Sequence, residues 1–226
     1  GYIPRRRMER MTIFQNMGWY MPATMMVAQG ERSFCNWDED SLTMAVAAAR
    51  DSLIGLDKSR VDAVYLASTT LPFADRQNAG IVKGALNLAD SCHTNDFTSS
   101  LKSGTSAMMA ALSAVRSGDR DQVLVVAADK RLAKAAGFYE MWFGDGAAAV
   151  TIGRSRVVAE YLGGHSLSLD FVDHFRGAGR KFDYTWEERW VRDAGYSEII
   201  PRTVGDLFEK LNISIEDVDK LVFPCF

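Results

Sequence analysis

One nearly uninterrupted apolar run limits the possible folds of this chain more than any other feature. Val123–Ala128 contains no polar side chain. Because such a run offers no face to water, it is typical of a strand that is covered on both sides of a sheet. Val61–Ala67 has a similar character, and helix-like segments separate the strand-like ones. This alternation predicts βαβ units, and therefore an α/β fold with a mixed, mostly parallel sheet.

The spacing of apolar side chains places the other elements. Leu42, Val46 and Ala49 recur at helical spacing, and Gly118 stands where a helix would end. We expect helices over residues 38–53, 78–88, 102–117 and 203–211. We expect strands over residues 61–67, 96–100, 123–128, 146–152 and 156–162, and another that begins over 219–223. We expect residues 165–200 to be irregular.

Composition excludes several classes of protein. The 226 residues carry 26 Lys and Arg against 29 Asp and Glu, a net charge of −3, which gives no sign of a nucleic-acid-binding surface. No apolar run reaches the roughly 18 residues of a membrane span. The cysteines at 35, 92 and 225 form no CxxC pair, which argues against a disulfide framework or a zinc site and suits the cytoplasm.

Neither end of the chain resembles a natural terminus. The sequence starts at Gly1 without an initiator Met and stops within the apolar run 221–226. The start also has no apolar segment of the kind that a secretory signal needs. We therefore expect a piece of a longer protein.

The first 30 residues allow two interpretations. They are rich in methionine and contain Arg5, Arg6, Arg7 and Arg10. A surface helix with an apolar Met, Phe and Trp face is one interpretation, and a segment that binds a partner or lines an acyl chain is the other, because Met adapts to irregular apolar ligands. The arginines are either solvated or ligands of phosphate.

Four segments, in order along the chain, together resemble one superfamily. They are 64–70, 96–105, 143–149 and 219–223. The segment Phe143–Ala149 resembles the glycine-rich signature of β-ketoacyl-ACP synthase III and hydroxymethylglutaryl-CoA synthase, and Asp96–Thr105 resembles the turn that bears their nucleophile. The opening Gly1–Pro4 resembles the exit of their first strand. The resemblance covers nearly the whole chain.

The resemblance implies a thiolase fold, in which two similar halves build αβαβα layers. Residues 1–226 would then hold the N-terminal half of a thiolase-like domain. A second half would begin near 156–226 and be truncated. The fold is usually well over 300 residues long in this family, so the resemblance also implies that both ends are incomplete.

All three catalytic positions of the family are altered here. Alignment on the flanking residues places Leu101 where the family has its nucleophilic Cys. It places Thr69 where the hydroxymethylglutaryl-CoA synthases have a Glu, and Pro224 where they have a His. Leu has no nucleophilic atom, Thr is no base near pH 7, and Pro has no titratable group. The sequence therefore predicts that no acyl-enzyme forms.

Other residues are candidates to replace the missing catalytic groups. Tyr139 is a candidate acid, since some relatives without the Cys resemble retro-aldolases that use tyrosines, but an aromatic residue there also suits a pocket wall. Ser103 is a candidate nucleophile or a helix-start cap, and Cys225 a reactive or an ordinary cysteine. His174 follows Asp173, which could fix its tautomer, or is structural. No residue set suggests a metal site.

The resemblance also implies residues that bind substrate. They are Lys102, Tyr139, Phe143, Gly144, Gly146, Trp186 and Arg189. Gly144 and Gly146 would allow close approach of a ligand or strand, with Asp145 orienting loop amides. Trp186 and Arg189 lie in a segment that resembles the region near the mouth of the CoA tunnel, where aromatic and charged groups suit adenine and phosphate. They suit a protein interface equally well.

Several functions remain open from the sequence. The first is an acyl-CoA-binding protein of lipid metabolism that acts in a multi-subunit complex for forming or cleaving C–C bonds, with a CoA thioester as substrate or ligand and no covalently bound cofactor. The alternatives are a non-catalytic scaffold that pairs with an active paralogue, a Cys-independent aldolase or retro-aldolase, and a CoA sensor. A homo- or heterodimer with a thiolase-like chain and an OB-fold/zinc-ribbon partner are expected from the resemblance.

Overall fold

The computed structural model describes residues 1–223 in two compact units, Gly1–Val157 and the remainder from Val158. Unit 1 holds β1 (Arg6–Glu9), α1 (Arg10–Met17), a 3₁₀ turn (Pro22–Val27), β2 (Glu31–Phe34), α2 (Ser41–Ser52), a 3₁₀ turn (Lys58–Arg60), β3 (Ala63–Ala67), α3 (Asn78–Ala85), β4 (His93–Phe97), α4 (Ser103–Ser117), β5 (Gln122–Asp129), α5 (Phe138–Trp142) and β6 (Gly146–Gly153). The predictions for Pro224 and Cys225 lie outside the described residues.

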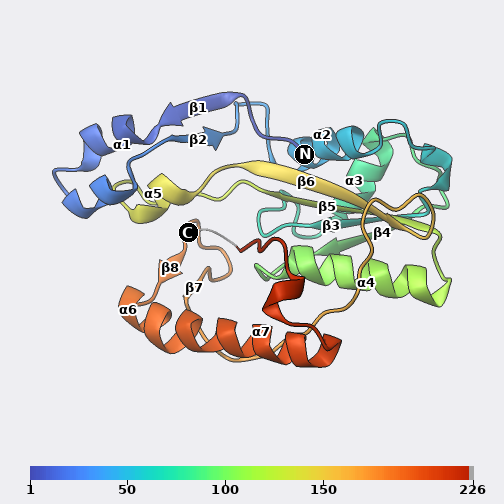
Figure 1. Cartoon of the computed structure of the whole chain (residues 1–226). Helices are drawn as coiled ribbons and strands as arrows, with labels where there is room; N and C mark the ends of the chain where they lie inside the picture. Colours follow the sequence, from blue (N-terminus) through green and yellow to red (C-terminus); the bar gives the residue numbers. More distant parts are fainter. Residues whose placement is uncertain (224–226) are drawn as a thin grey trace. The chain divides into compact units, whose positions relative to one another are not determined.

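A four-stranded sheet in the order β4-β3-β5-β6 forms the centre of unit 1 (Figure 1). Strand β3 pairs in parallel with both β4 and β5, and β6 pairs antiparallel with β5. The prediction of a mixed, mostly parallel sheet is confirmed. The apolar run that dominates the sequence is β5, one of its two central strands.

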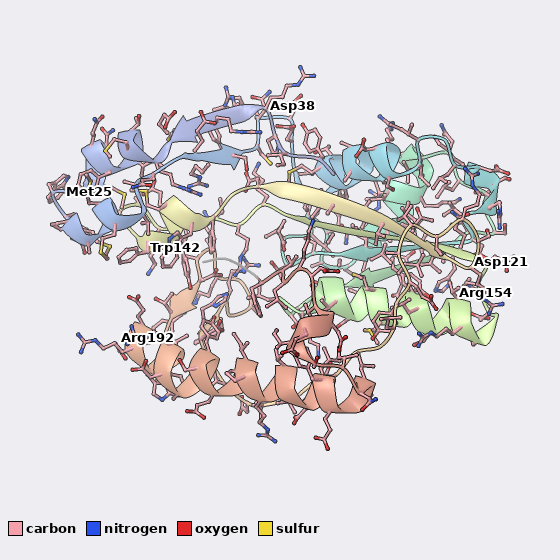
Figure 2. All side chains as sticks on the ribbon, in the orientation of Figure 1. Met25, Asp38, Asp121, Trp142, Arg154 and Arg192 are labelled. Atoms are coloured by element: carbon pink, nitrogen blue, oxygen red, sulfur yellow. The ribbon has the colours of Figure 1, made fainter. Side chains whose placement is uncertain are left out.

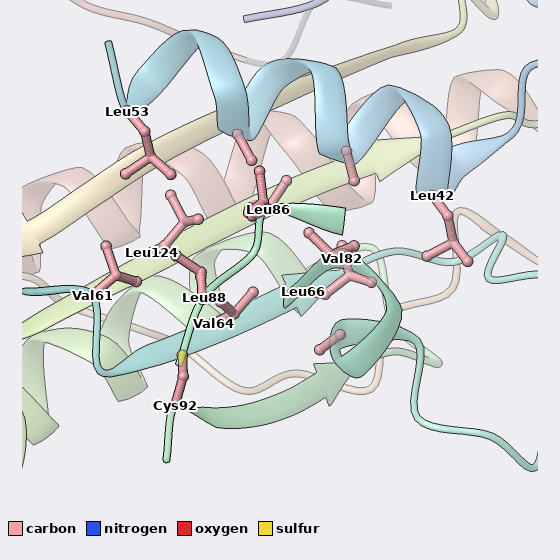
Figure 3. Packing of buried hydrophobic residues seen from close by; sticks show 14 of the residues in the cluster. Leu42, Leu53, Val61, Val64, Leu66, Val82, Leu86, Leu88, Cys92 and Leu124 are labelled. Carbon is pink, nitrogen blue, oxygen red and sulfur yellow. The ribbon is translucent and has the colours of Figure 1, made fainter. Parts of the chain in front are cut away.

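Helices cover both faces of this sheet, as the apolar strands require. On one face, α2 and α3 pack on Val64, Leu66 and Leu124, within a cluster shown in Figure 3. On the other face, Ala107 and Ala111 of α4 pack on Val123 and its neighbours in a second cluster. Alternate residues of each strand therefore enter opposite layers, and burial on both sides explains why β5 carries no polar side chain between Val123 and Ala128.

Local capping decides where the helices begin and end. Helix α2 starts at Ser41, three residues later than expected, because the Asp40 side chain accepts a hydrogen bond from the backbone N–H of Thr43 at 2.8 Å. Helix α4 ends as expected at Gly118, which has φ of +83°. Strand β4 runs over His93–Phe97, so its expected position at 96–100 was wrong by three residues.

The N-terminal segment is a two-stranded hairpin with a helical arm, which corrects the expectation of a single surface helix. Strands β1 and β2 pair antiparallel, and α1 and the 3₁₀ turn lie between them in the chain. Ile13, Met17 and Ala28 bury their side chains with Met141 of α5. Tyr2 pairs with Ala147 of β6 through two backbone hydrogen bonds of 2.8 Å, so the opening residues extend the sheet by one bridge.

Unit 2 contains β7 (His174–Phe175), β8 (Tyr184–Thr185), α6 (Glu188–Trp190), a π-helical segment (Val191–Tyr196), α7 (Ser197–Leu211) and a 3₁₀ turn (Ile215–Asp217). Residues 165–200 are thus not wholly irregular, and α7 begins six residues earlier than predicted although Pro201 lies inside it. The strand expected over 156–162 does not form: Arg156 has φ of +56°, and Val158 is fully exposed. The strand expected from 219 does not form within the described residues.

No helix among the described residues has both the length and the apolar character that crossing a bilayer requires.

Candidate functional site

Three of the four motifs found in the sequence, those within unit 1, meet at one edge of the sheet. Ala67 of β3 is in register with Phe97 of β4 and Ala127 of β5, and these three strands are parallel. Their carboxyl ends therefore share an edge, which is where open α/β sheets bind ligands. Thr69, Ser99 and Asp129 each stand two residues beyond this register line. The antiparallel β6 starts at the same edge, since Gly146 pairs with Asp129.

The turn after β3 is organised around the carboxylate of Asp129. Its Oδ1 accepts hydrogen bonds from the Ser68 hydroxyl at 3.1 Å, the Thr69 N–H at 2.8 Å, the Thr69 hydroxyl at 3.0 Å and the Thr70 hydroxyl at 2.8 Å. The Thr70 hydroxyl also accepts from the N–H of Lys130 at 2.9 Å. The Thr69 side chain thus helps to hold a turn against the end of β5.

The turn between β4 and α4 presents no reactive side chain at its tip. Leu101 is 54% exposed there, and Ser99 adopts φ of +66°, an uncommon conformation for a residue other than glycine. Ser103 is buried, and its hydroxyl donates to the carbonyl oxygen of Ser100 at 2.6 Å. Lys102 is exposed and directly precedes α4. Ser103 therefore stabilises the start of the helix.

The glycine-rich loop is held against β2 and the residue after it by three hydrogen bonds. The Ser33 hydroxyl donates to the carbonyl oxygen of Asp145 at 2.8 Å, and the Asp145 N–H donates to the Ser33 carbonyl oxygen at 3.2 Å. The buried Asp145 carboxylate accepts the N–H of Cys35 at 2.8 Å. A Cβ at Gly144 would lie 3.1 Å from Ser33 Oγ. The close approach expected of Gly144 is observed, but neither it nor Gly146 has a positive φ.

Aromatic side chains gather on and after α5, directly before this loop. The rings of Tyr139 and Phe143 stack with centroids 4.5 Å apart and planes 10° from parallel, and Arg131 lies over the Phe143 ring at 5.1 Å. Arg10 and Arg32 hold the segment in place: Arg10 Nε donates to the Met141 carbonyl oxygen at 2.8 Å, and Arg32 donates to that of Glu140 at 2.7 Å. The N-terminal arm therefore positions the aromatic segment.

Unit 2 brings Trp186 into a second aromatic group. Trp190 stacks on Phe171 with centroids 4.4 Å apart, and the Trp186 ring is 6.1 Å from that of Trp190. Trp186 is half exposed. Arg189 is exposed one residue before Trp190, on the short helix α6.

An Asp–His pair also lies in unit 2. His174 Nδ1 is 3.1 Å from Asp173 Oδ2, which accepts a further hydrogen bond from the Tyr196 hydroxyl at 2.9 Å. Burial alone would raise the pKa of Asp173, but hydrogen bonds from the His174 N–H and the Tyr196 hydroxyl, with the attraction of His174, lower it below its usual value. The acidic neighbour expected to orient His174 is thus in contact with it.

No family model matches the chain, but individual relatives do. The hydroxymethylglutaryl-CoA synthase of Methanosarcina mazei is 32% identical over 230 residues, which cover 99% of this chain and 65% of that protein. The enzyme of the same name from Methanopyrus kandleri is 30% identical, with 99% and 64% of the two chains covered. The chain therefore spans slightly less than two thirds of the length of these curated relatives.

Solved structures agree on the fold. A crystal structure of hydroxymethylglutaryl-CoA synthase complexed with CoA matches with a TM-score of 0.83 and 18% identity, over 96% of this chain and 56% of the other. A 3-oxoacyl-(acyl-carrier-protein) synthase III matches with a TM-score of 0.78 and 18% identity, over 96% and 74%. This chain is a thiolase-fold protein similar to hydroxymethylglutaryl-CoA synthases.

Both described cysteines of this synthase-like chain are buried, and neither lies in the turn before α4. Burial, reinforced by the Asp145 carboxylate, raises the pKa of the Cys35 thiol to about 12. Burial also raises the pKa of Cys92, which packs in the core between the sheet and α3. A thiol with a raised pKa is a poor nucleophile because little thiolate is present. Neither cysteine therefore substitutes for the nucleophilic Cys that the family has at the position of Leu101.

Most residues at the site edge of the synthase-like chain were predicted from the sequence, but one, Asp129, was not. Thr69, Leu101 and the loop that contains Gly144 and Gly146 all lie at the same edge, whereas Trp186 and Arg189 belong to unit 2. Asp129 was not singled out, because nothing local in the sequence marks the acid that ends an apolar strand. Within residues 1–223, no group of three or more His, Cys, Asp or Glu side chains could hold a metal ion.

Proposed function

We propose that this chain binds a CoA thioester and does not form an acyl-enzyme. The observation that carries the proposal is the turn before α4, where the family places its nucleophile. Its tip holds the exposed, unreactive Leu101, while the hydroxyl of Ser103 is engaged with a backbone carbonyl. A covalent acyl intermediate needs an activated nucleophilic side chain, and the tip of this turn supplies none.

The other altered positions support the same proposal. Thr69 stands at the expected Glu position with its hydroxyl directed to Asp129 at 3.0 Å. Pro224, at the expected His position, is outside the described residues. We assign residues 1–226 to the N-terminal half of a thiolase-like domain, with a truncated second half that begins near 156–226.

Residues suited to binding a CoA thioester are present although Leu101 replaces the nucleophilic Cys. We assign substrate contacts to Lys102, Tyr139, Phe143, Gly144 and Gly146 at the sheet edge, and to Trp186 and Arg189 in unit 2. The matched relative with bound CoA supports a CoA species as the ligand class. Lys and Arg suit phosphate, and exposed indole suits adenine. CoA would act as a substrate or ligand and not as a covalently attached cofactor.

A chain that binds CoA thioesters without acylation suits a role in an assembly. We propose that it works in lipid metabolism in the cytoplasm as a pseudoenzyme subunit. In this role it forms a homo- or heterodimer with a thiolase-like chain and contacts an OB-fold/zinc-ribbon protein. Co-purification with a Cys-bearing homologue, without turnover by this chain alone, would support that role over catalysis.

One observation favours a second function, C–C bond cleavage or formation without a Cys. Tyr139 is stacked on Phe143 directly before the glycine-rich loop, so a phenol lies beside the site. A phenol could supply a proton in an aldol or retro-aldol step. Retro-aldol activity that persists in Tyr139→Phe excludes this role for Tyr139, and activity that disappears in this variant supports it.

Equilibrium dialysis with radiolabelled acetyl-CoA tests the binding proposal. We expect saturable binding that Arg189→Ala weakens, because a phosphate contact is lost. Arg192→Ala is the matched control: Arg192 is exposed, lies in the π-helical segment Val191–Tyr196, pairs with Asp193 at 2.8 Å, and points outward in Figure 2. No saturable binding, or equal losses in the two variants, would contradict the assignment of Arg189.

A further inference from the structure

The carboxylate of Asp129 is anchored through only one of its oxygens. All four of its hydrogen bonds reach Oδ1, from the side chains of Ser68, Thr69 and Thr70 and from one backbone N–H. Among the residues that the structure describes, none donates to Oδ2. Asp129 is only half-buried, so this second oxygen remains accessible. The side chain is therefore fixed in orientation while one oxygen stays available.

One of the residues that anchor Asp129 occupies a catalytic position at which the family has a base. Thr69 occupies the position where the resemblance expects a Glu, and its hydroxyl lies 3.0 Å from Asp129 Oδ1. A carboxylate is thus present at the same sheet edge, supplied by the end of β5 instead of by the turn after β3. Four short contacts hold it without further ordering, which is the arrangement that efficient proton transfer needs.

We propose that Asp129 is a proton acceptor for the acyl group of a bound CoA thioester. This proposal rests on the proposed function, since it requires that the thioester binds. Oδ2 takes a proton from the carbon next to the thioester carbonyl. The electron pair of that C–H bond forms a C–C double bond, and the carbonyl π pair moves to the oxygen, which gives an enolate. The reverse steps return a proton from Asp129 to carbon, so no co-reactant is needed.

Deuterium exchange isolates this step from any condensation or cleavage. Acetyl-CoA is incubated with the chain in D₂O, and deuterium in the acetyl methyl group is followed by NMR. We expect exchange that falls about 10²-fold or more in Asp129→Asn, the range for loss of a general base. Asp121→Asn is the matched control: Asp121 precedes β5 at the far end of the sheet from Trp142 (Figure 2) and is exposed.

Two further measurements separate proton transfer from a structural role. Asp129→Asn should lose exchange while its melting temperature shows that it is folded and dialysis shows that it still binds acetyl-CoA. An Asp129→Asn variant that binds acetyl-CoA and exchanges as fast as Asp121→Asn overturns the proposal. If Asp129→Asn does not fold, Thr69→Val decides, because it removes one anchor and leaves the carboxylate.

Thr69→Val should keep exchange at a reduced rate, because one of the four contacts that orient the carboxylate is lost, and exchange as fast as in Asp121→Asn overturns the assignment. Dialysis with acetyl-CoA distinguishes failure of the proposed function from failure of the role of Asp129. Absence of binding overturns both the proposed function and the role of Asp129. Binding without exchange overturns only the role of Asp129.

Discussion

A methyl group added at Gly144 tests how tightly the glycine-rich loop packs on β2. A Cβ there would lie 3.1 Å from Ser33 Oγ, closer than ordinary van der Waals contact. The same Ser33 hydroxyl donates to the carbonyl oxygen of Asp145 at 2.8 Å. Because Gly144 does not have a positive φ, backbone strain does not contribute to the expected effect. The cost of Gly144→Ala should therefore come from displacing this hydroxyl.

The expected magnitude is that of one hydrogen bond. Displacing the Ser33 hydroxyl by a few tenths of an ångström weakens its bond to Asp145, and a typical hydrogen bond contributes about 0.5–1.5 kcal/mol. We expect Gly144→Ala to lower the free energy of unfolding by about 1 kcal/mol in urea titrations. For a chain of this size, the melting temperature would fall by roughly 2–4 °C. Gly146→Ala is the control, since its Cβ would be 3.5 Å from the Tyr2 carbonyl oxygen, an ordinary contact.

A double-mutant cycle identifies the cause. In a Ser33→Ala background the hydroxyl is absent, so Gly144→Ala should cost much less than in the unaltered chain. An equal cost in both backgrounds would refute the reasoning, because the methyl group would then clash with something other than the Ser33 hydroxyl. A cost for Gly146→Ala as large as for Gly144→Ala would also refute it.

Three further predictions concern the core, the thiols and the acid response. Leu66→Ala should lower the free energy of unfolding by about 2–5 kcal/mol in urea, because Leu66 is fully buried in the core; a smaller loss would mean that the site collapses around the cavity. Cys35 and Cys92 should resist iodoacetamide at pH 8 and react after denaturation, as peptide mapping would show, because burial raises the pKa of both thiols; rapid alkylation of either in the native chain contradicts its placement. The pKa of Asp173 is lowered on folding, so its stabilising effect is fully present above about pH 4, the unfolded value, and is lost as pH falls through the folded value. Asp173→Asn should therefore be less stable than the unaltered chain at pH 7 and close to it near pH 2, and an equal difference at both pH values would count against this linkage.

The sheet of unit 1 was predictable because its signals are local. A strand covered on both faces, such as β5, must be apolar throughout, so its position is evident from the residues alone. The end of α4 was equally clear, because Gly118 adopts the left-handed conformation that glycine favours. The start of α2 was misplaced because three acidic residues precede it and only Asp40 accepts the capping hydrogen bond.

The parts that could not be predicted depend on distant contacts. The partners of Asp129 lie about 60 positions earlier in the sequence, so no local pattern marks it. Strands β1 and β2 are separated in the chain by α1 and a 3₁₀ turn, so no local pattern predicts the pairing of Arg7 with Ser33. In unit 2, α7 continues through Pro201, a residue that usually ends or kinks a helix, so sequence patterning placed its start too late.

Acylation of the chain by labelled acetyl-CoA tests the central claim most directly. The unaltered chain and Leu101→Cys are incubated side by side, and hydroxylamine-sensitive label on protein is measured. Leu101 is exposed, so the substitution should leave the fold intact, and a thiol beside the positive N-terminal end of α4 gains nucleophilicity. The account predicts label on Leu101→Cys and none on the unaltered chain. Stoichiometric, hydroxylamine-sensitive label on the unaltered chain would contradict it.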